Sequence, residues 1–209
     1  MVIDSAGWPF VGGALVLAGL LGWWLGWWGV VPGVLLAVAF LFFFRDPDRT
    51  MTAQAHAVVS PADGRVMVAG PPIGQAVPSG RWQQVSIFLS PMDVHVNRIP
   101  VSGRVTKVQY HPGRFLPAYK HEAGDLNEYT EVWVDHGGTP IVFRQIVGVL
   151  ARRIVCRAKE GDEVTAAHRF GVMKFGSRMD IFLPESARLV VRPNDRVVAG
   201  VTAIAMLSE

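Results

Sequence analysis

The N-terminal part of the chain is a long apolar block without charge. No charged residue lies between Asp4 and Arg45. A membrane-spanning helix needs only about 20 apolar residues, so the block is longer than one span requires. Tryptophans, which prefer the membrane–water interface, cluster at its middle and are followed by turn-forming glycine and proline. The pattern predicts a helical hairpin with arms of roughly Trp8–Trp24 and Gly29–Phe44, and it leaves open whether the shorter second arm spans completely.

The charges at the two ends of this block predict how the chain meets a membrane. A cleaved signal peptide would begin with positive residues, whereas this chain begins with MVIDSAG and carries only Asp4 there, which disfavours that alternative. Arg45 and Arg49 follow the block, so the positive-inside rule places the remainder of the chain on the cytoplasmic side of the cell (inner) membrane. Residues 1–48 are therefore predicted to be a membrane anchor and residues 49–209 a separate domain.

The second domain has the pattern of a β protein. Short runs rich in Val, Ile and Phe, such as GRVMVAG, WQQVSIFLS and TEVWVDH, are separated by Gly and Pro. No long segment repeats with the 3.6-residue period of a helix, so we expect a mostly β fold, a compact β-sandwich or barrel. The stretches AKEGDEVTAAHRFG and VRPNDRVVAGVTAIA share a turn, Asp-x-Val and a second short strand, a pattern similar to the hairpins of lipoyl carrier domains.

Composition narrows the possible partners. The formal net charge is only +3, which suits an anionic membrane surface but is too small to indicate nucleic-acid binding. The single cysteine, Cys156, excludes an intramolecular disulfide.

The stretch Phe170–Pro184 contains a serine in an unexpected place. Apolar residues at odd positions alternate with charged residues at even positions, which predicts a half-buried strand. Ser177 falls on the apolar face, directly after Gly176, a residue type that weakens strands. Lys174 would lie on the opposite face, so it cannot serve as a base for Ser177. The hydroxyl is either an ordinary core hydroxyl or a nucleophile whose base comes from another segment.

Two other polar residues stand out. His95 lies in FLSPMDVHVNRIPVSG, where an apolar strand meets a Ser-Pro turn, and Asp63 lies in SPADGRV. Taken singly, such a histidine is more often structural, and an Asp-Gly after proline is usually a turn. The chain has no GxSxG elbow, as a membrane serine hydrolase would need, and no CxxC, HExxH or P-loop motif.

Together these segments resemble a known family. SPADGRV, FLSPMDVHVNRIPVSG and FGSRMDIFLP, in this order after an apolar N-terminus and FFFRDPDR, resemble phosphatidylserine decarboxylases. NEYTEVWVDHGG and RQIVGVLARRIVCRAKEGDEVTAAHRFG are similar to the short bacterial and archaeal branch of that family, and the resemblance runs from about Arg45 to Glu209.

The resemblance implies a self-processing enzyme. The chain would cut itself between Gly176 and Ser177, and Ser177 would become a covalent pyruvoyl group. The matured enzyme would convert phosphatidylserine to phosphatidylethanolamine and CO2 through a Schiff base, without pyridoxal phosphate or a metal. In the family an Asp–His–Ser set assists cleavage, and Asp63 and Ser177 match two of its members. The histidine motif there has two histidines three residues apart; here His95 occupies the first position and an arginine the second.

That departure leaves two alternatives for the base. Either His95 takes over the role, or the base comes from another segment. The arginine at the second position, Arg98, could instead hold the lipid phosphate, as could Arg152 or Arg153, although each is as readily an ordinary arginine.

The resemblance also implies partners: phosphatidylserine, an anionic membrane, and the two cleavage fragments held together as a heterodimer. A homo-oligomer and the diacyl or diether nature of the lipid stay open. The rival hypothesis is a membrane-tethered, lipoyl-like binding or adaptor module without catalysis, which gives no reason for Gly-Ser on a core face.

Overall fold

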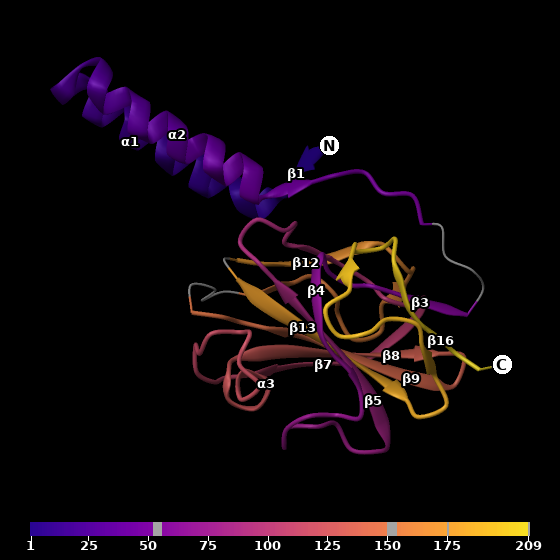
Figure 1. The fold of residues 1–209 in the computed structure, drawn as a ribbon. Coiled ribbons are helices and arrows are strands. Elements are labelled where there is room, and N and C mark those ends of the chain that lie inside the picture. Colours follow the sequence, from indigo (N-terminus) through magenta and orange to yellow (C-terminus); the bar gives the residue numbers. More distant parts are fainter. Residues whose placement is uncertain (52–55, 150–153, 175, 209) are drawn as a thin grey trace. The chain divides into compact units, whose positions relative to one another are not determined.

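The computed structural model describes residues 1–51, 56–149, 154–174 and 176–208, and the chain divides into two compact units, Met1–Asp48 and Arg49–Glu209 (Figure 1). The first unit consists of two short paired strands, one 3₁₀ helix and two α-helices. Its elements are β1 (Val2–Ile3), the 3₁₀ helix η1 (Ser5–Gly7), α1 (Trp8–Leu25), α2 (Trp27–Phe43) and β2 (Arg45–Asp46), with β1 and β2 antiparallel.

The two helices form the predicted helical hairpin, and the turn falls between the two predicted arms. Gly26 separates α1 from α2 and has φ +60°, a left-handed conformation that glycine adopts without steric cost. Gly29 lies inside α2, where a side chain would overlap the carbonyl of Leu21, and the helix continues through Pro32. The glycine predicted to turn the chain therefore allows the helices to approach each other closely.

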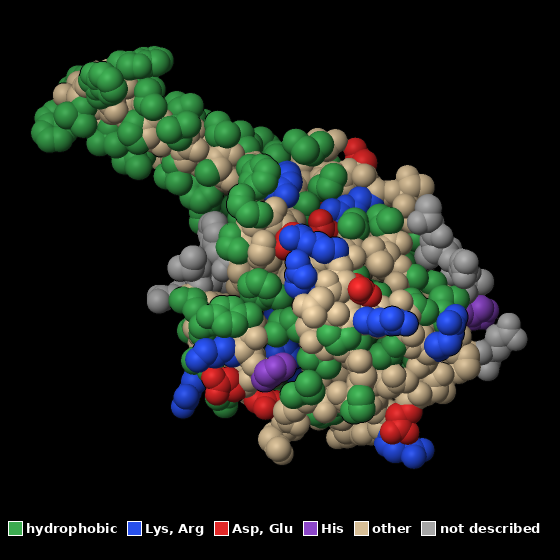
Figure 2. Space-filling view, viewed as in Figure 1, with side chains coloured by type: hydrophobic (Ala, Val, Ile, Leu, Met, Phe, Trp, Pro, Cys, Tyr) green, Lys and Arg blue, Asp and Glu red, His purple; other side chains and the backbone are tan. Residues whose placement is uncertain are grey.

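The helices are apolar on their outside as well. Trp23 is 91% exposed, and hydrophobic side chains cover the hairpin (Figure 2). The segment Ser5–Leu25 is long and apolar enough to cross a membrane, whereas Trp27–Phe43 is apolar but shorter. Exposing apolar surface to water costs about 25 cal/mol per Å², so the exposed apolar side chains of this hairpin would destabilise a chain dissolved in water.

The second unit is mostly β, as predicted. An eight-stranded sheet has the order β11-β7-β8-β9-β13-β5-β4-β15, and two three-stranded sheets have the orders β10-β12-β6 and β14-β16-β3. Over the described residues none of these sheets closes on itself. Of the two predicted folds, the structure therefore fits an open, sandwich-like arrangement and not a closed barrel. The similarity of its hairpins to lipoyl domains stays a prediction. The elements are β3 (Ala57–Val59), β4 (Gly64–Gly70), β5 (Trp82–Leu89), β6 (Val96–Arg98), β7 (Gly103–His111), α3 (Ala123–Leu126), β8 (Tyr129–His136), β9 (Thr139–Ile146), β10 (Ile154–Cys156), β11 (Glu163–Val164), β12 (Arg169–Met173), β13 (Ser177–Pro184), β14 (Arg188–Leu189), β15 (Arg196–Val197) and β16 (Ala203–Met206).

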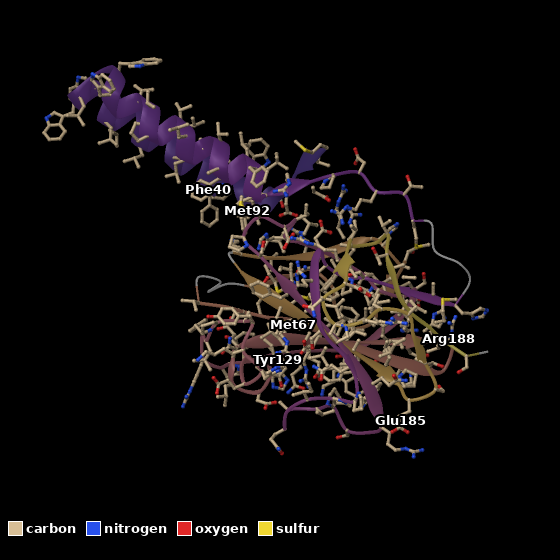
Figure 3. The ribbon with its side chains drawn as sticks, viewed as in Figure 1. Phe40, Met67, Met92, Tyr129, Glu185 and Arg188 are labelled. Carbon is tan, nitrogen blue, oxygen red and sulfur yellow. The ribbon has the colours of Figure 1, made fainter. Side chains whose placement is uncertain are left out.

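Strand β13 lies inside the large sheet, between β5 and β9. It pairs with β5 from Ser177 to Pro184 and with β9 from Arg178 to Phe182. It ends at Pro184, before a turn that begins at Glu185, and both Glu185 and the first residue of β14, Arg188, are exposed (Figure 3). The odd-numbered residues of β13 after Ser177 belong to the main apolar core, which also takes residues from the small sheets, such as Phe170 and Ile204.

The opposite face of β13 is also buried, so the half-buried strand of the prediction is wrong. Arg178 and Asp180 are each 1% exposed. Two loops cover this face. Ile73, in the first, donates its backbone N–H to Gln84 of β5, and the carbonyl of Lys120, in the second, lies 3.4 Å from Nη1 of Arg178. Charged residues at every second position show that one face of a strand is polar. They do not show whether that face lies in solvent or under a loop that supplies hydrogen-bond partners.

Candidate active site

The site is centred on the point where the chain crosses from one sheet to another. β12 belongs to a small sheet and ends at Met173, whereas β13 begins in the large sheet at Ser177. The continuous strand predicted over Phe170–Pro184 is therefore interrupted. Gly176 stands at the crossing with φ +75°, a conformation that L side chains rarely adopt. This glycine lets the backbone turn directly before the serine.

The Ser177 hydroxyl is buried and has no hydrogen-bond partner within the described residues. The residue is 0% exposed, and its Oγ is among the few buried side-chain atoms without a partner there. Leaving a buried hydroxyl unsatisfied costs about 1–3 kcal/mol, so an ordinary core hydroxyl would be expected to find an acceptor. The unpartnered Oγ is instead available to react.

The carbonyl that precedes Ser177 is closely enclosed by backbone. A Cβ added at Gly148 would overlap the carbonyl oxygen of Gly176. Gly148 follows β9 and is buried. Only glycine therefore fits at this position with the carbonyl in its present place. Sequence reasoning missed Gly148, since nothing near it in the chain indicates a contact with a residue so far along.

His95 lies against the same peptide. It precedes β6, is 1% exposed, and its own carbonyl accepts a hydrogen bond from the N–H of Met173 at the end of β12 (3.2 Å). Its Nδ1 is 2.9 Å from the carbonyl oxygen of Asp93. Because a carbonyl can only accept, this contact places the ring proton on Nδ1 and leaves Nε2 as an acceptor. Nε2 accepts the N–H of Gly176 at 3.4 Å.

Asp63, which was predicted to act together with His95 and Ser177, forms its described contacts with other residues. Its carboxylate forms an ion pair with Arg49, in which Nη2 is 2.7 Å from Oδ2, and its Oδ1 accepts the N–H of Ala199 at 2.8 Å. The hydrogen bonds described for Asp63 thus lead to Arg49 and Ala199, while the imidazole of His95 is oriented by a backbone carbonyl. The Asp63 segment still supports the site, since the carbonyl of Pro61 accepts the N–H of Arg98 in β6.

Of the three arginines predicted to hold phosphate, only Arg98 lies within the described residues. Arg98 is 6% exposed, donates from Nη1 to the carbonyl of Ala167 (3.0 Å), and lines a pocket of about 320 Å³ with Ala167, His168 and Arg169. A guanidinium carries only hydrogen-bond donors and no acceptor, so Arg98 cannot replace a histidine as the base. Arg152 and Arg153 lie outside the described residues.

An apolar pocket of about 150 Å³ opens beside Gly176. Tyr119, which is 60% exposed, stands edge-on to Phe88, with ring centroids 6.1 Å apart. The reacting peptide is thus next to a surface that accepts apolar groups. The residues around the pocket are Phe88, Pro91, Pro117, Ala118, Tyr119, Val149 and Gly176.

Other chemistries receive less support from the geometry. Burial raises the pKa of the Cys156 thiol, so it is a poor nucleophile near neutral pH. In the described part of the chain, no three His, Cys, Asp or Glu side chains are grouped so that they could hold a metal ion. The residues around Ser177 fit the formation of a pyruvoyl group from it, because the serine hydroxyl is buried and unpartnered in the described chain and follows a left-handed glycine whose N–H contacts the imidazole of His95.

Comparison with known proteins identifies the family. The family model described as phosphatidylserine decarboxylase matches residues 36–205. The chain is 43% identical to the phosphatidylserine decarboxylase proenzyme of Chlorobium phaeobacteroides, over 94% of this chain and 97% of that one. It is 44% identical to the proenzyme of the same name from Symbiobacterium thermophilum, over 100% and 97%, and 43% identical to that of Saccharopolyspora erythraea, over 99% and 89%. The chain therefore belongs to the phosphatidylserine decarboxylase family.

Proposed function

We propose that this chain is a proenzyme that cuts itself between Gly176 and Ser177 and then decarboxylates phosphatidylserine to phosphatidylethanolamine. One observation carries the proposal. Nε2 of His95 lies 3.4 Å from the amide nitrogen of Gly176, and the hydroxyl of the following residue, Ser177, is buried without a partner in the described chain. Family membership supports the same function, and the relatives are named proenzymes.

The proposed cleavage uses Ser177, Gly176 and His95, and it requires the Ser177 hydroxyl to replace the Gly176 N–H as the partner of His95 Nε2. Ser177 Oγ adds to the carbonyl carbon of Gly176 as His95 Nε2 accepts the hydroxyl proton. The bond from that carbon to the Ser177 nitrogen then breaks, the nitrogen takes the proton from His95 and leaves as an amine, and an ester replaces the amide. Loss of the Cα proton then expels the Gly176 carboxylate and leaves a carbon–carbon double bond at residue 177. Addition of water and loss of ammonia give the ketone. Burial of Ser177 restricts competing water during the first two steps.

A pyruvoyl group formed from Ser177 would supply an electron sink for the charge left when CO2 departs, the task that an organic cofactor performs in other decarboxylases. The chain's own residues bind and orient the lipid. We assign His95 to proton transfer at the reacting carbon as well, because in the uncut chain its Nε2 contacts Gly176, the residue directly before Ser177. Arg98, Arg152 and Arg153 are the proposed partners of the lipid phosphate, and Asp63 is proposed to hold the segment before β4 in place through Arg49 and Ala199.

The activity can be tested with phosphatidylserine labelled in the serine carboxyl carbon. The matured protein is expected to release labelled CO2 and form phosphatidylethanolamine. Free serine should react much more slowly, because the rest of the lipid orients the head group. A matured protein that releases no label from phosphatidylserine, yet decarboxylates a soluble amino acid well, would refute the lipid substrate.

We also propose that the helical hairpin anchors the protein in the inner membrane, with both termini on the cytoplasmic side. Arg45 and Arg49 next to the apolar helices support this orientation. A β-galactosidase fused to the C-terminus, which works only in the cytoplasm, is expected to be active. An alkaline phosphatase fused at the same point, which works only after export, should be inactive; the reverse result would contradict the orientation.

A further inference from the structure

Maturation changes how residue 177 is attached. Before the cut it is held through Gly176 and Arg178, and afterwards only through Arg178 and the backbone pairing of β13. New chain ends fray unless they are tied down. Since the reacting group would be the first residue of the small fragment, its position depends on how firmly Arg178 is fixed.

Arg178 is fixed by a buried ion pair within its own strand and by the next strand. Its Nε is 2.6 Å from Oδ1 of Asp180, and its Nη2 is 2.9 Å from Oδ2. The same Nη2 donates to the hydroxyl of Ser86 in β5 at 3.1 Å. Asp180 Oδ2 also accepts from Nε2 of Gln84 at 3.0 Å. These contacts use the planar fork of the guanidinium, which an ammonium group cannot reproduce.

The same guanidinium reaches the loop that lines the apolar pocket. Nη1 is 3.4 Å from the carbonyl oxygen of Lys120 and 3.5 Å from that of His121. Gly124 packs against the group so closely that a Cβ there would lie 3.2 Å from Nη2. Pro117, Ala118 and Tyr119, a few residues earlier in this loop, line the pocket beside Gly176. One side chain therefore contacts both the reacting strand and the segment that forms the pocket wall.

We propose that Arg178 is a positioning residue of the mature enzyme, which holds the Ser177-derived group and the pocket wall of loop 113–126 in a fixed relation. It lies on the face of β13 opposite Ser177, so it acts through other groups and does not touch the substrate. The inference rests on the proposed function, since it assigns a role within that reaction. A shift of about 1 Å in a reacting group can lower a rate by about 100-fold, so loss of this fixation should affect turnover strongly.

The test compares Arg178→Lys with a matched control, Arg144→Lys. Arg144 also forms a buried two-point ion pair, from Nε and Nη2 to Glu131 Oε2 at 2.7 and 2.6 Å, and also donates to a loop carbonyl, that of Ala76. The loop that contains Ala76, however, does not line the apolar pocket beside Gly176. The matured fraction is measured by intact mass, kcat and KM are measured per mole of matured small fragment, and hydrogen exchange is measured for peptides covering residues 114–126.

Arg178→Lys is expected to mature, to lose about 10- to 100-fold in kcat, and to exchange faster over residues 114–126. Arg144→Lys should keep the kcat and the 114–126 exchange of the wild type. Equal kcat and exchange in Arg178→Lys and the wild type would overturn the proposal, as would an equal loss in both variants.

A second variant covers the case in which Arg178→Lys does not fold. In Gly124→Val the added side chain would push the loop away from the guanidinium of Arg178, while Arg178 and Asp180 themselves are unchanged. This variant is expected to mature and to show the same fall in kcat and the same faster exchange as Arg178→Lys. Wild-type behaviour of Gly124→Val would also count against the proposal. A wild-type protein that releases no CO2 would refute the proposed function. The hydrogen-exchange measurement needs no substrate, so it would still test whether Arg178 fixes the loop.

Discussion

Ser177→Ala is expected to remain a single full-length chain with no decarboxylase activity. The substitution removes the only atom of residue 177 that can attack the Gly176 carbonyl, so neither the ester nor the ketone can form. The fold should persist, since Oγ has no partner in the described structure and its removal breaks no hydrogen bond there. Intact mass of the purified protein and CO2 release from labelled phosphatidylserine measure the two effects.

The control for this variant is Ser60→Ala. Ser60 is also fully buried, but its hydroxyl donates to the carbonyl of Ala62. That variant should lose some stability, about 1 kcal/mol, and still be cut. A Ser177→Ala chain that yields two fragments at the 176–177 bond would contradict the cleavage chemistry.

His95→Gln is expected to slow cleavage by about 10²- to 10⁴-fold, the usual effect of removing a positioned base. Glutamine is similar in size and can still hydrogen-bond, but it cannot accept the hydroxyl proton. The half-time of the full-length chain after synthesis measures the effect. Asp63→Ala is expected to slow cleavage less, because its partners are Arg49 and Ala199.

The matched control is His136→Gln. Nδ1 of His136 also contacts a backbone carbonyl, that of Ser102 at 2.7 Å, but the residue ends β8 at the far end of the strand from the site. It should mature at the wild-type rate. If His95→Gln matures as fast as this control, the base must come from another segment, the second alternative that the sequence leaves open.

Features that depend on local pattern could be predicted from the sequence. The uncharged N-terminal block predicted the helical hairpin, and short Val- and Ile-rich runs predicted a mostly β second unit. Alternation along β13 placed Ser177 on the core side and Arg178 on the other. These follow from periodicity, which the residues themselves carry.

Features that depend on contacts between distant segments could not be predicted. The alternation of Phe170–Pro184 continues through the crossing between two sheets, although the structure buries both faces of β12 from Phe170 onward and both faces of β13. The covering loop that buries Arg178 lies far away in the chain. The same is true of Gly148, which is required by the carbonyl of Gly176, and of Arg49, which pairs with Asp63.

The place of β13 between β5 and β9 has a consequence for how this enzyme can be made. If the chain is cut as proposed, the small fragment begins with an inner strand of the sheet, and pulling it out would break hydrogen bonds along both edges. The halves should therefore remain together without a covalent link. The prosthetic group, however, arises only from an uncut Gly176–Ser177 bond that is already folded. Two fragments synthesised separately could at best assemble into the fold of the enzyme, with an ordinary serine in place of the ketone. Active enzyme can therefore form only from the intact precursor.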